Sequence, residues 1–159
     1  MAKLEDILNW RMVGDDISTS GQPTVEEFDA LAKSGVTAMI NLAPYDNDNA
    51  MPTEGALMQK LGIDYIHIPV DFDAPTDQDF DQFQAALTQF KSQRLHVHCI
   101  YNARVSAFFL RHAQDTAPER VEPLTDQMHT IWKPGGVWAA FINCPSDVSE
   151  KNRYLGYDY

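Results

Sequence analysis

Two spacings of hydrophobic residues alternate along this chain. Short apolar runs have the length of buried strands, and they lie at residues 36–42, 63–70 and 95–99. Between these runs, hydrophobic residues recur every three or four positions, as on one face of a helix. The clearest such face lies in residues 77–90 and consists of Phe80, Phe83, Leu87 and Phe90. Strands that alternate with helices predict an α/β domain in three layers, with a mainly parallel central sheet flanked by helices.

Three of the expected helices follow a threonine that is suited to the N-cap position. Thr24, with Glu27 three residues later, predicts a capping box. Thr53 is expected to cap a short helix that ends at Gly62, and Thr76 is expected to cap the helix with the phenylalanine face. These caps set the expected starts of the helices.

Weaker elements complete the outline of the chain. They are edge strands at 11–13 and 17–19, a helix that ends near Asp115, and helical segments at 122–131 and 136–141. The polar tail from Pro145 onward is expected to be peripheral. We therefore expect a single domain over residues 1–159, in which residues 116–159 form a helical C-terminal extension.

Composition and charge narrow the possible partners. Hydrophobic residues make up 44% and charged residues 22% of the 159 residues, which are ordinary values for a globular domain. The net charge of −11 argues against binding to nucleic acid or to anionic membranes, because their phosphates would be repelled. No apolar run approaches the roughly 20 residues that span a bilayer. The N-terminus lacks the basic and apolar regions of a signal peptide, so we expect a cytoplasmic protein, and the oligomeric state stays open.

The strongest chemical signal lies between Leu95 and Phe109. This stretch begins as a strand, turns after Cys99, and resumes with helical spacing beside Arg104. The backbone N–H groups of a first helical turn and the helix dipole attract anions and activate a cysteine thiol as a nucleophile. Arg104 can offer its planar guanidinium to an oxyanion held there. Cys99 ends one strand and Asp71 follows another, so both are expected at the same edge of a parallel sheet.

The other cysteine and the histidines carry weaker signals. Cys144 is expected to be a buried structural residue, and two cysteines do not make a disulfide framework. His96 and His98 share a face of the strand, which raises the possibility of a His-x-His metal pair. Only Cys99 is adjacent as a further ligand, so we expect neither a metal nor a cofactor.

Four stretches, taken in their order along the chain, resemble a known family. One is the loop that combines His98-Cys99 with a closely following arginine and Ser106. The others are Ser18 to Thr24, Val36 to Leu42 and Tyr65 to Val70. Over roughly residues 15–115 they resemble a bacterial branch of the cysteine-dependent protein tyrosine and dual-specificity phosphatases. This branch contains small phosphatase-like domains, formerly of unknown function, related to the front part of beta-lactamase-hydrolase-like proteins.

The resemblance implies a dual-specificity-phosphatase-like fold and hydrolysis of a phosphorylated substrate. Cys99 would attack phosphorus to form a cysteinyl-phosphate, while Arg104 and the loop amides bind the phosphate oxygens. Asp71 would be the general acid, with Asp73 as the second candidate. Ser106 would either assist departure of the thiolate or bond to the helix backbone. The residues expected to form or brace the substrate-binding loop are His98, Ile100, Tyr101, Asn102, Ala103 and Val105.

Two positions depart from the phosphatase pattern and leave alternatives open. The superfamily has its arginine six positions after the cysteine, where this chain has Val105, whereas Arg104 comes five positions after Cys99. Five is the spacing of the rhodanese sulfurtransferase loop, so a persulfide-handling protein is one alternative. Asn102 replaces the usual glycine, which is a mild change because asparagine tolerates the left-handed conformation. A second alternative is a module that binds a small oxyanion without turnover.

Overall fold

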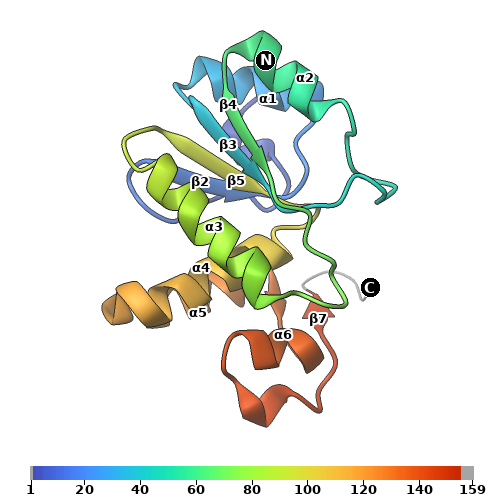
Figure 1. The fold of residues 1–159 in the computed structure, drawn as a ribbon, viewed down its shortest axis with the longest axis vertical. Helices are drawn as coiled ribbons and strands as arrows, with labels where there is room; N and C mark the ends of the chain where they lie inside the picture. Colours follow the sequence, from blue (N-terminus) through green and yellow to red (C-terminus); the bar gives the residue numbers. More distant parts are fainter. Residues whose placement is uncertain (1, 155–159) are drawn as a thin grey trace.

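A five-stranded sheet forms the centre of the computed structural model, which describes residues 2–154. The strand order is β1-β2-β5-β3-β4, so that β5 lies in the middle (Figure 1). The strands are β1 (Arg11–Met12), β2 (Ile17–Ser20), β3 (Ala38–Asn41), β4 (Asp64–His67) and β5 (Leu95–His98). In this sheet β1 is antiparallel to β2, and all other neighbouring strands are parallel. The prediction of a mainly parallel sheet is confirmed.

Helices cover both faces of this sheet (Figure 1). One face carries η1 (Leu4–Asp6), α1 (Val25–Lys33) and α2 (Glu54–Leu61). On the other lie α3 (Asp77–Gln89) and α4 (Ala103–Thr116), and beyond α4 follow η2 (Pro118–Arg120), α5 (Val121–Met128), α6 (Gly136–Phe141) and η3 (Pro145–Asp147). Strand β3 shows the division, because Met39 packs with α1 and α2 while Ala38 and Ile40 face the larger core. Among residues 2–154, no helix is both long and apolar enough to cross a bilayer.

The expected helix caps are confirmed at two of three positions. Thr24 and Thr76 each accept a hydrogen bond from the third residue of their helix and complete a capping box. Thr53 and Gly62 occupy the N-cap and C-cap positions of α2 as expected, but the Thr53 side chain makes no capping hydrogen bond. Its backbone, at φ −89° and ψ 7°, is not extended, and an extended N-cap is what lets the hydroxyl reach the third N–H group. The phenylalanine face of α3 is buried, as expected.

The C-terminal extension differs most from its prediction. Both expected helical segments are present, but the tail returns as β7 (Arg153–Tyr154), which pairs antiparallel with β6 (Trp132–Lys133). Tyr154 lies opposite Trp132 in this ribbon and is only 8% exposed, so the expectation of a peripheral tail is wrong there. Two strand residues carry too little periodicity to be recognised in a sequence.

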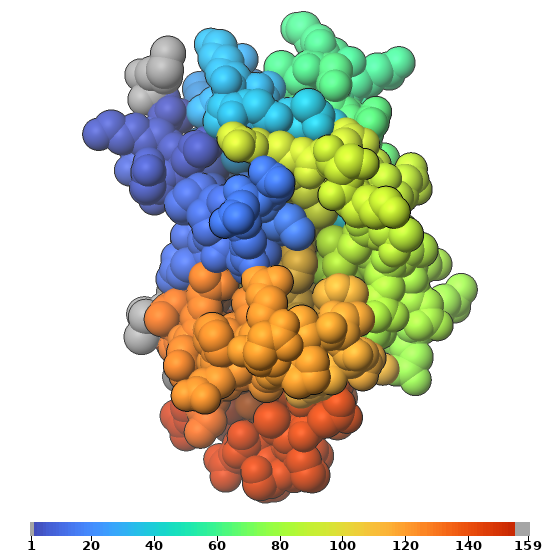
Figure 2. Space-filling view, turned by 90° about the vertical axis from the view of Figure 1, so that its left-hand side faces the viewer, coloured from blue at the N-terminus to red at the C-terminus, as the bar shows by residue number. Residues whose placement is uncertain are grey.

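Side-chain contacts fix the extension to the edge of the sheet. Figure 2 shows the segment of α5, in orange, against the N-terminal strands, in blue. Gln127 Nε2 donates to the carbonyl of Met12 at 2.9 Å, and Arg11 Nη2 donates to Thr130 Oγ1 at 3.1 Å. The extension therefore packs on the same body as the sheet.

Gly135 allows the two segments of the β6–β7 ribbon to approach closely, and its substitution tests this packing. A β-carbon there would overlap the carbonyl group of Glu150, which is backbone and cannot move aside. We expect Gly135→Ala to lower the free energy of unfolding by about 1–3 kcal/mol, measured by urea titration. Gly14→Ala is the control, because nothing lies within 4 Å of its added β-carbon. It should change stability by less than about 0.5 kcal/mol, and equal losses in both variants would contradict this account.

Candidate active site

The loop Cys99–Asn102 joins the central strand β5 to the start of α4. Its end is held by Asn102, which has a left-handed backbone with φ 73°, as expected for the residue at the glycine position. The Asn102 amide donates to the carbonyl of Asn9 at 2.8 Å and to Thr19 Oγ1 at 3.0 Å. The Cys99 N–H donates to the carbonyl of Ser20 at 3.3 Å. Both ends of the loop are therefore bound to the segments beside β5.

Three successive carbonyl groups of this loop accept hydrogen bonds from groups outside it. The Cys99 carbonyl accepts from His98 Nδ1 at 2.9 Å. The Ile100 carbonyl accepts from the Gln22 N–H at 3.0 Å, and the Tyr101 carbonyl accepts from Asn9 Nδ2 at 2.8 Å. In a trans peptide the N–H group points opposite to the carbonyl. Each of the next three N–H groups therefore points away from the partner of its neighbouring carbonyl, so these bonds leave it able to donate to an anion.

A buried ion pair lies directly behind the loop. His98 Nε2 is 2.6 Å from Glu54 Oε2, both side chains are fully buried, and Gln22 Nε2 donates to Glu54 Oε1 at 3.0 Å. Because the Cys99 carbonyl can only accept, His98 Nδ1 carries a proton, and a second proton lies between Nε2 and the carboxylate. Burial alone would raise the pKa of Glu54. The charge on His98 and hydrogen bonds from His98, Gln22 and Tyr65 outweigh it, so the pKa of Glu54 is lowered.

His96 belongs to a separate buried polar group. Its Nδ1 is 2.7 Å from Ser18 Oγ, and its Nε2 is 2.8 Å from Ser20 Oγ. Ser20 donates its hydroxyl hydrogen to the Gly21 carbonyl, so Nε2 is the ring nitrogen that carries the proton. Burial, together with the nearby charge of His98, holds the pKa of His96 well below its ordinary value. The ring nitrogens of both histidines are thus directed at hydrogen-bond partners and not at a shared metal.

Arg104 faces a small pocket of about 210 Å³ next to the loop. Its side chain is 7% exposed, and its guanidinium carbon lies 5.0 Å from the centre of the Phe72 ring. Among the described residues, Arg104 Nε has no hydrogen-bond partner. The pocket is lined by Asn47, Phe72, Asp73, Ile100, Tyr101, Ala103, Arg104 and Tyr154. Arg104 thus brings a planar cation to the pocket beside the loop, and its buried Nε keeps an unused donor.

The two candidate acids lie differently with respect to this pocket. Asp73 lines the pocket, whereas Asp71 does not. Asp71 Oδ1 accepts the backbone N–H of Asp73 at 2.9 Å, which is an Asx turn that orients the loop after β4. Cys99 itself is fully buried at the base of the loop. Cys99 is not among the residues that line the pocket, but the next residue of the loop, Ile100, is.

The hydroxyl of Ser106 is engaged with the helix. It donates to the carbonyl of Ala103 at 2.9 Å and accepts from Trp132 Nε1 at 2.9 Å. Of the two roles left open by the sequence, the bond to the helix backbone is the one present. Val105 and Asn102 are buried and do not line the pocket.

Comparison with known proteins agrees with this geometry. The family model described as a DSP-PTPase phosphatase fused to NAD+ kinase matches residues 7–129. This chain belongs to that phosphatase family. The predicted membership of the cysteine-dependent tyrosine and dual-specificity phosphatases is thereby confirmed.

Related structures and sequences extend the comparison. A DUF442 phosphatase structure from Shewanella putrefaciens CN-32 is 30% identical, covers 88% of this chain and 92% of its own, and has a TM-score of 0.76. The beta-lactamase hydrolase-like protein of Xylella fastidiosa strain Temecula1 is 31% identical over 90 residues. That match covers 55% of this chain but only 21% of the Xylella protein. The catalytic core of the PP-IP phosphatase SIW14 from S. cerevisiae shares the fold at 15% identity, with a TM-score of 0.66 over 86% of this chain and 85% of its own.

Several residues of this phosphatase-family site were not found from the sequence. Glu54 is the first residue of α2, where an acid is explained by the helix dipole alone. Asn47 belongs to a polar loop without a distinguishing pattern, and Tyr154 follows Cys99 by 55 residues in the tail. Phe72 stands between the two candidate acids, Asp71 and Asp73. This position was the one sequence feature that could have pointed to a place for Phe72 in the site.

Replacement of Glu54 tests the support behind the loop. We expect Glu54→Gln to lower the free energy of unfolding at pH 7 by about 3 kcal/mol, because it leaves the buried His98 without its counter-charge. The folded-state pKa of Glu54 is depressed, so the wild type has this stabilisation above its ordinary value of 4.5 and loses it as the pH falls through the lowered pKa. The difference between the two proteins should therefore shrink from pH 7 to pH 3 in urea titrations.

The control for this experiment is Glu26→Gln, which removes an exposed acid from α1. It should change stability by less than about 0.5 kcal/mol at either pH. A Glu54→Gln loss of the same size at pH 7 and pH 3 would contradict the buried ion pair.

Proposed function

We propose that this chain hydrolyses phosphomonoesters through a cysteinyl-phosphate intermediate. The observation that carries the proposal is that three successive loop carbonyls accept hydrogen bonds from His98, Gln22 and Asn9, which leaves the N–H groups of the same peptide bonds directed away from those partners. Arg104 adds a positive charge at the same place. Such donors, fixed before substrate arrives, stabilise the charge that develops on the oxygens of a phosphoryl group.

The reaction takes two displacement steps at phosphorus. In the first, the Cys99 thiolate forms an S–P bond while the P–O bond to the leaving group breaks, and Asp73 gives that oxygen its proton. In the second, the Asp73 carboxylate takes a proton from water as the water oxygen bonds to phosphorus. The S–P bond then breaks, inorganic phosphate leaves, and the thiolate is restored. Arg104 and the loop amides hold the equatorial oxygens throughout.

Asp73 is proposed as the acid in place of Asp71. It borders the pocket that leads to the loop, and Asp71 does not. Asp71 instead uses Oδ1 to bind the backbone of Asp73, so it positions the turn. A general acid must lie within hydrogen-bond reach of the leaving oxygen, which favours the residue at the pocket.

A second candidate function rests on the five-residue step from Cys99 to Arg104. In a persulfide-handling protein, Cys99 would accept a sulfur atom from thiosulfate and release sulfite. Treatment with thiosulfate would then raise the mass of Cys99 by one sulfur atom. Turnover of phosphoesters without this mass increase favours the phosphatase.

Removal of the nucleophile tests the proposed function. We expect Cys99→Ser to reduce the kcat for p-nitrophenyl phosphate by at least about 10³-fold, since a serine hydroxyl is a far weaker nucleophile here. Cys144→Ser is the matched control and should retain activity, because that half-buried cysteine lies outside the pocket. Equal activity of Cys99→Ser and the wild type would eliminate the mechanism.

The assignment of the acid is tested with two leaving groups. Asp73→Asn should lower the kcat for phenyl phosphate about 10²-fold, and Asp71→Asn should lower it less than tenfold. The loss in Asp73→Asn should be smaller for p-nitrophenyl phosphate, whose leaving group needs less protonation. If Asp71→Asn shows the larger loss and the leaving-group dependence, the role of acid belongs to Asp71.

A further inference from the structure

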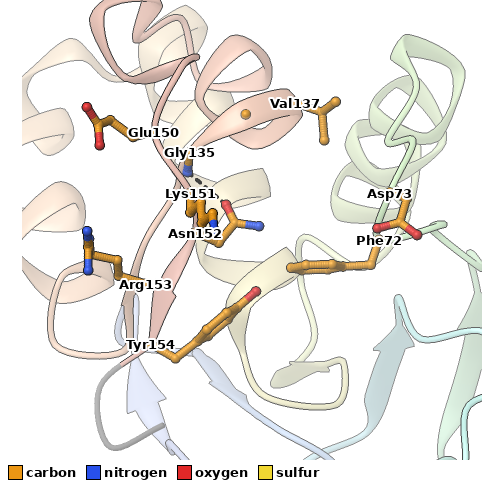
Figure 3. Close-up of a pocket in the computed structure, with 10 residues that line it drawn as sticks. Phe72, Asp73, Gly135, Val137, Glu150, Lys151, Asn152, Arg153 and Tyr154 are labelled. Carbon is orange, nitrogen blue, oxygen red and sulfur yellow. Dashed lines mark hydrogen bonds between the residues drawn. The ribbon is translucent and has the colours of Figure 1, made fainter. Parts of the chain in front are cut away.

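Tyr154 stands between two adjoining pockets. The inner pocket is the one of about 210 Å³ that contains Arg104. The outer pocket, of about 650 Å³, lies against the turn at Gly135 and the segment that precedes β7. Phe72, Asp73 and Tyr154 line both. Figure 3 shows Phe72 and Tyr154 extending toward one another from separate segments of the chain.

The Tyr154 ring is held in place by other aromatic rings. It stacks on Trp132 with ring centres 5.7 Å apart and planes at 17°, and it meets Tyr101 of the loop edge-on at 5.7 Å. Trp132 in turn donates from Nε1 to Ser106 on α4. The ring is thus fixed both to the loop and to the helix that begins with the loop.

The opposite side of the passage is fixed as well. Trp138 Nε1 donates to the Phe72 carbonyl at 2.7 Å, and the Arg104 guanidinium lies over the Phe72 ring. Burial raises the pKa of the Tyr154 hydroxyl well above its ordinary value, a hydrogen bond with Asn152 and the charge of Arg104 lower it, and the charge of Cys99 raises it. Tyr154 therefore presents a neutral phenol within electrostatic range of both residues.

We propose that Tyr154 is the specificity-determining residue of the site, an inference that rests on the proposed phosphatase function. The inner pocket is smaller than the about 300–1,000 Å³ of ordinary ligand sites, so it holds the phosphoryl group and little more. The leaving group must pass between Tyr154 and Phe72 to reach the outer pocket. Flat or slender groups fit between two opposed rings, and bulky branched groups do not. The substrate class is therefore phosphomonoesters of flat or slender hydroxyl compounds.

Two substrates of different shape test this proposal. We compare kcat/KM for p-nitrophenyl phosphate with kcat/KM for 3-O-methylfluorescein phosphate, whose ring system is bulky and not flat. Tyr154→Ala should raise the ratio of bulky to flat substrate at least tenfold, and Tyr154→Trp should lower it. Tyr154→Phe keeps the ring and should leave the ratio within about twofold. Lys133→Ala, at the exposed position of the paired strand β6 and outside both pockets, is the matched control and should also leave it unchanged.

A second measurement does not require turnover. In a Cys144→Ser background, the rate at which fluorescein maleimide labels Cys99 is followed by mass spectrometry. Tyr154→Ala should accelerate labelling at least tenfold, and iodoacetamide, a smaller reagent, should show a smaller gain. Thermal melts identify any variant that fails to fold. If Tyr154→Ala does not fold, Tyr154→Trp, which keeps an aromatic ring, is used in its place and should give the opposite change.

The two readouts separate the two proposals. If the wild type hydrolyses neither phosphoester but Tyr154→Ala accelerates the labelling of Cys99, the phosphatase mechanism fails. The control of access to Cys99 by Tyr154 then still stands. If hydrolysis depends on Cys99 but neither the substrate ratio nor the labelling rate changes with residue 154, the specificity role is overturned.

Discussion

The direction of the peptide groups after β5 decides what this site can bind. A carbonyl oxygen turned toward an anion repels it, and an N–H group in the same place attracts it. Here the orientation depends on partners outside the loop, of which His98 is the most deeply buried. His98 is held in turn by Glu54 on α2, on the opposite face of the sheet from α4. The loop geometry therefore rests on an ion pair whose desolvation cost is offset by the attraction between His98 and Glu54 and by the hydrogen bonds around them.

The strongly acidic chain still forms a site suited to anions, because the relevant charges act over short distances. At physiological ionic strength, exposed charges are screened beyond about 8–10 Å. Arg104 is 7% exposed, so its interaction with a phosphate in the pocket is screened far less than that of a surface arginine. The amide dipoles of the loop act in the same desolvated space. A net charge of −11 is therefore compatible with a local preference for a negative ligand.

Sequence periodicity was sufficient to locate the strands and most helices, since each pattern lies within one short segment of the chain. It also led to Cys99 and Arg104, because the strand, loop and helix that position them are contiguous. It could not lead to Glu54, whose contact with His98 spans 44 residues and exists only after α2 packs on the sheet. The choice of Asp71 or Asp73 as the general acid depends on which of the two side chains the turn directs to the pocket. Two acids separated by one residue do not reveal this in the sequence. The need for glycine at position 21 is also not visible in the sequence. A β-carbon there would lie 2.5 Å from the carbonyl oxygen of Ile100, a residue far away in the chain.

The place of Tyr154 in the chain has a consequence for the protein while it is being made. A ribosome adds about 5–20 residues per second, and Tyr154 follows Cys99 by 55 residues. For roughly 3–11 seconds the nascent chain thus contains the thiol but not the ring that covers its pocket. An oxidant or alkylating compound in the cell meets a more open sulfur in this interval than it does in the folded protein. Slower translation of the codons between Cys99 and Tyr154 would lengthen that exposure.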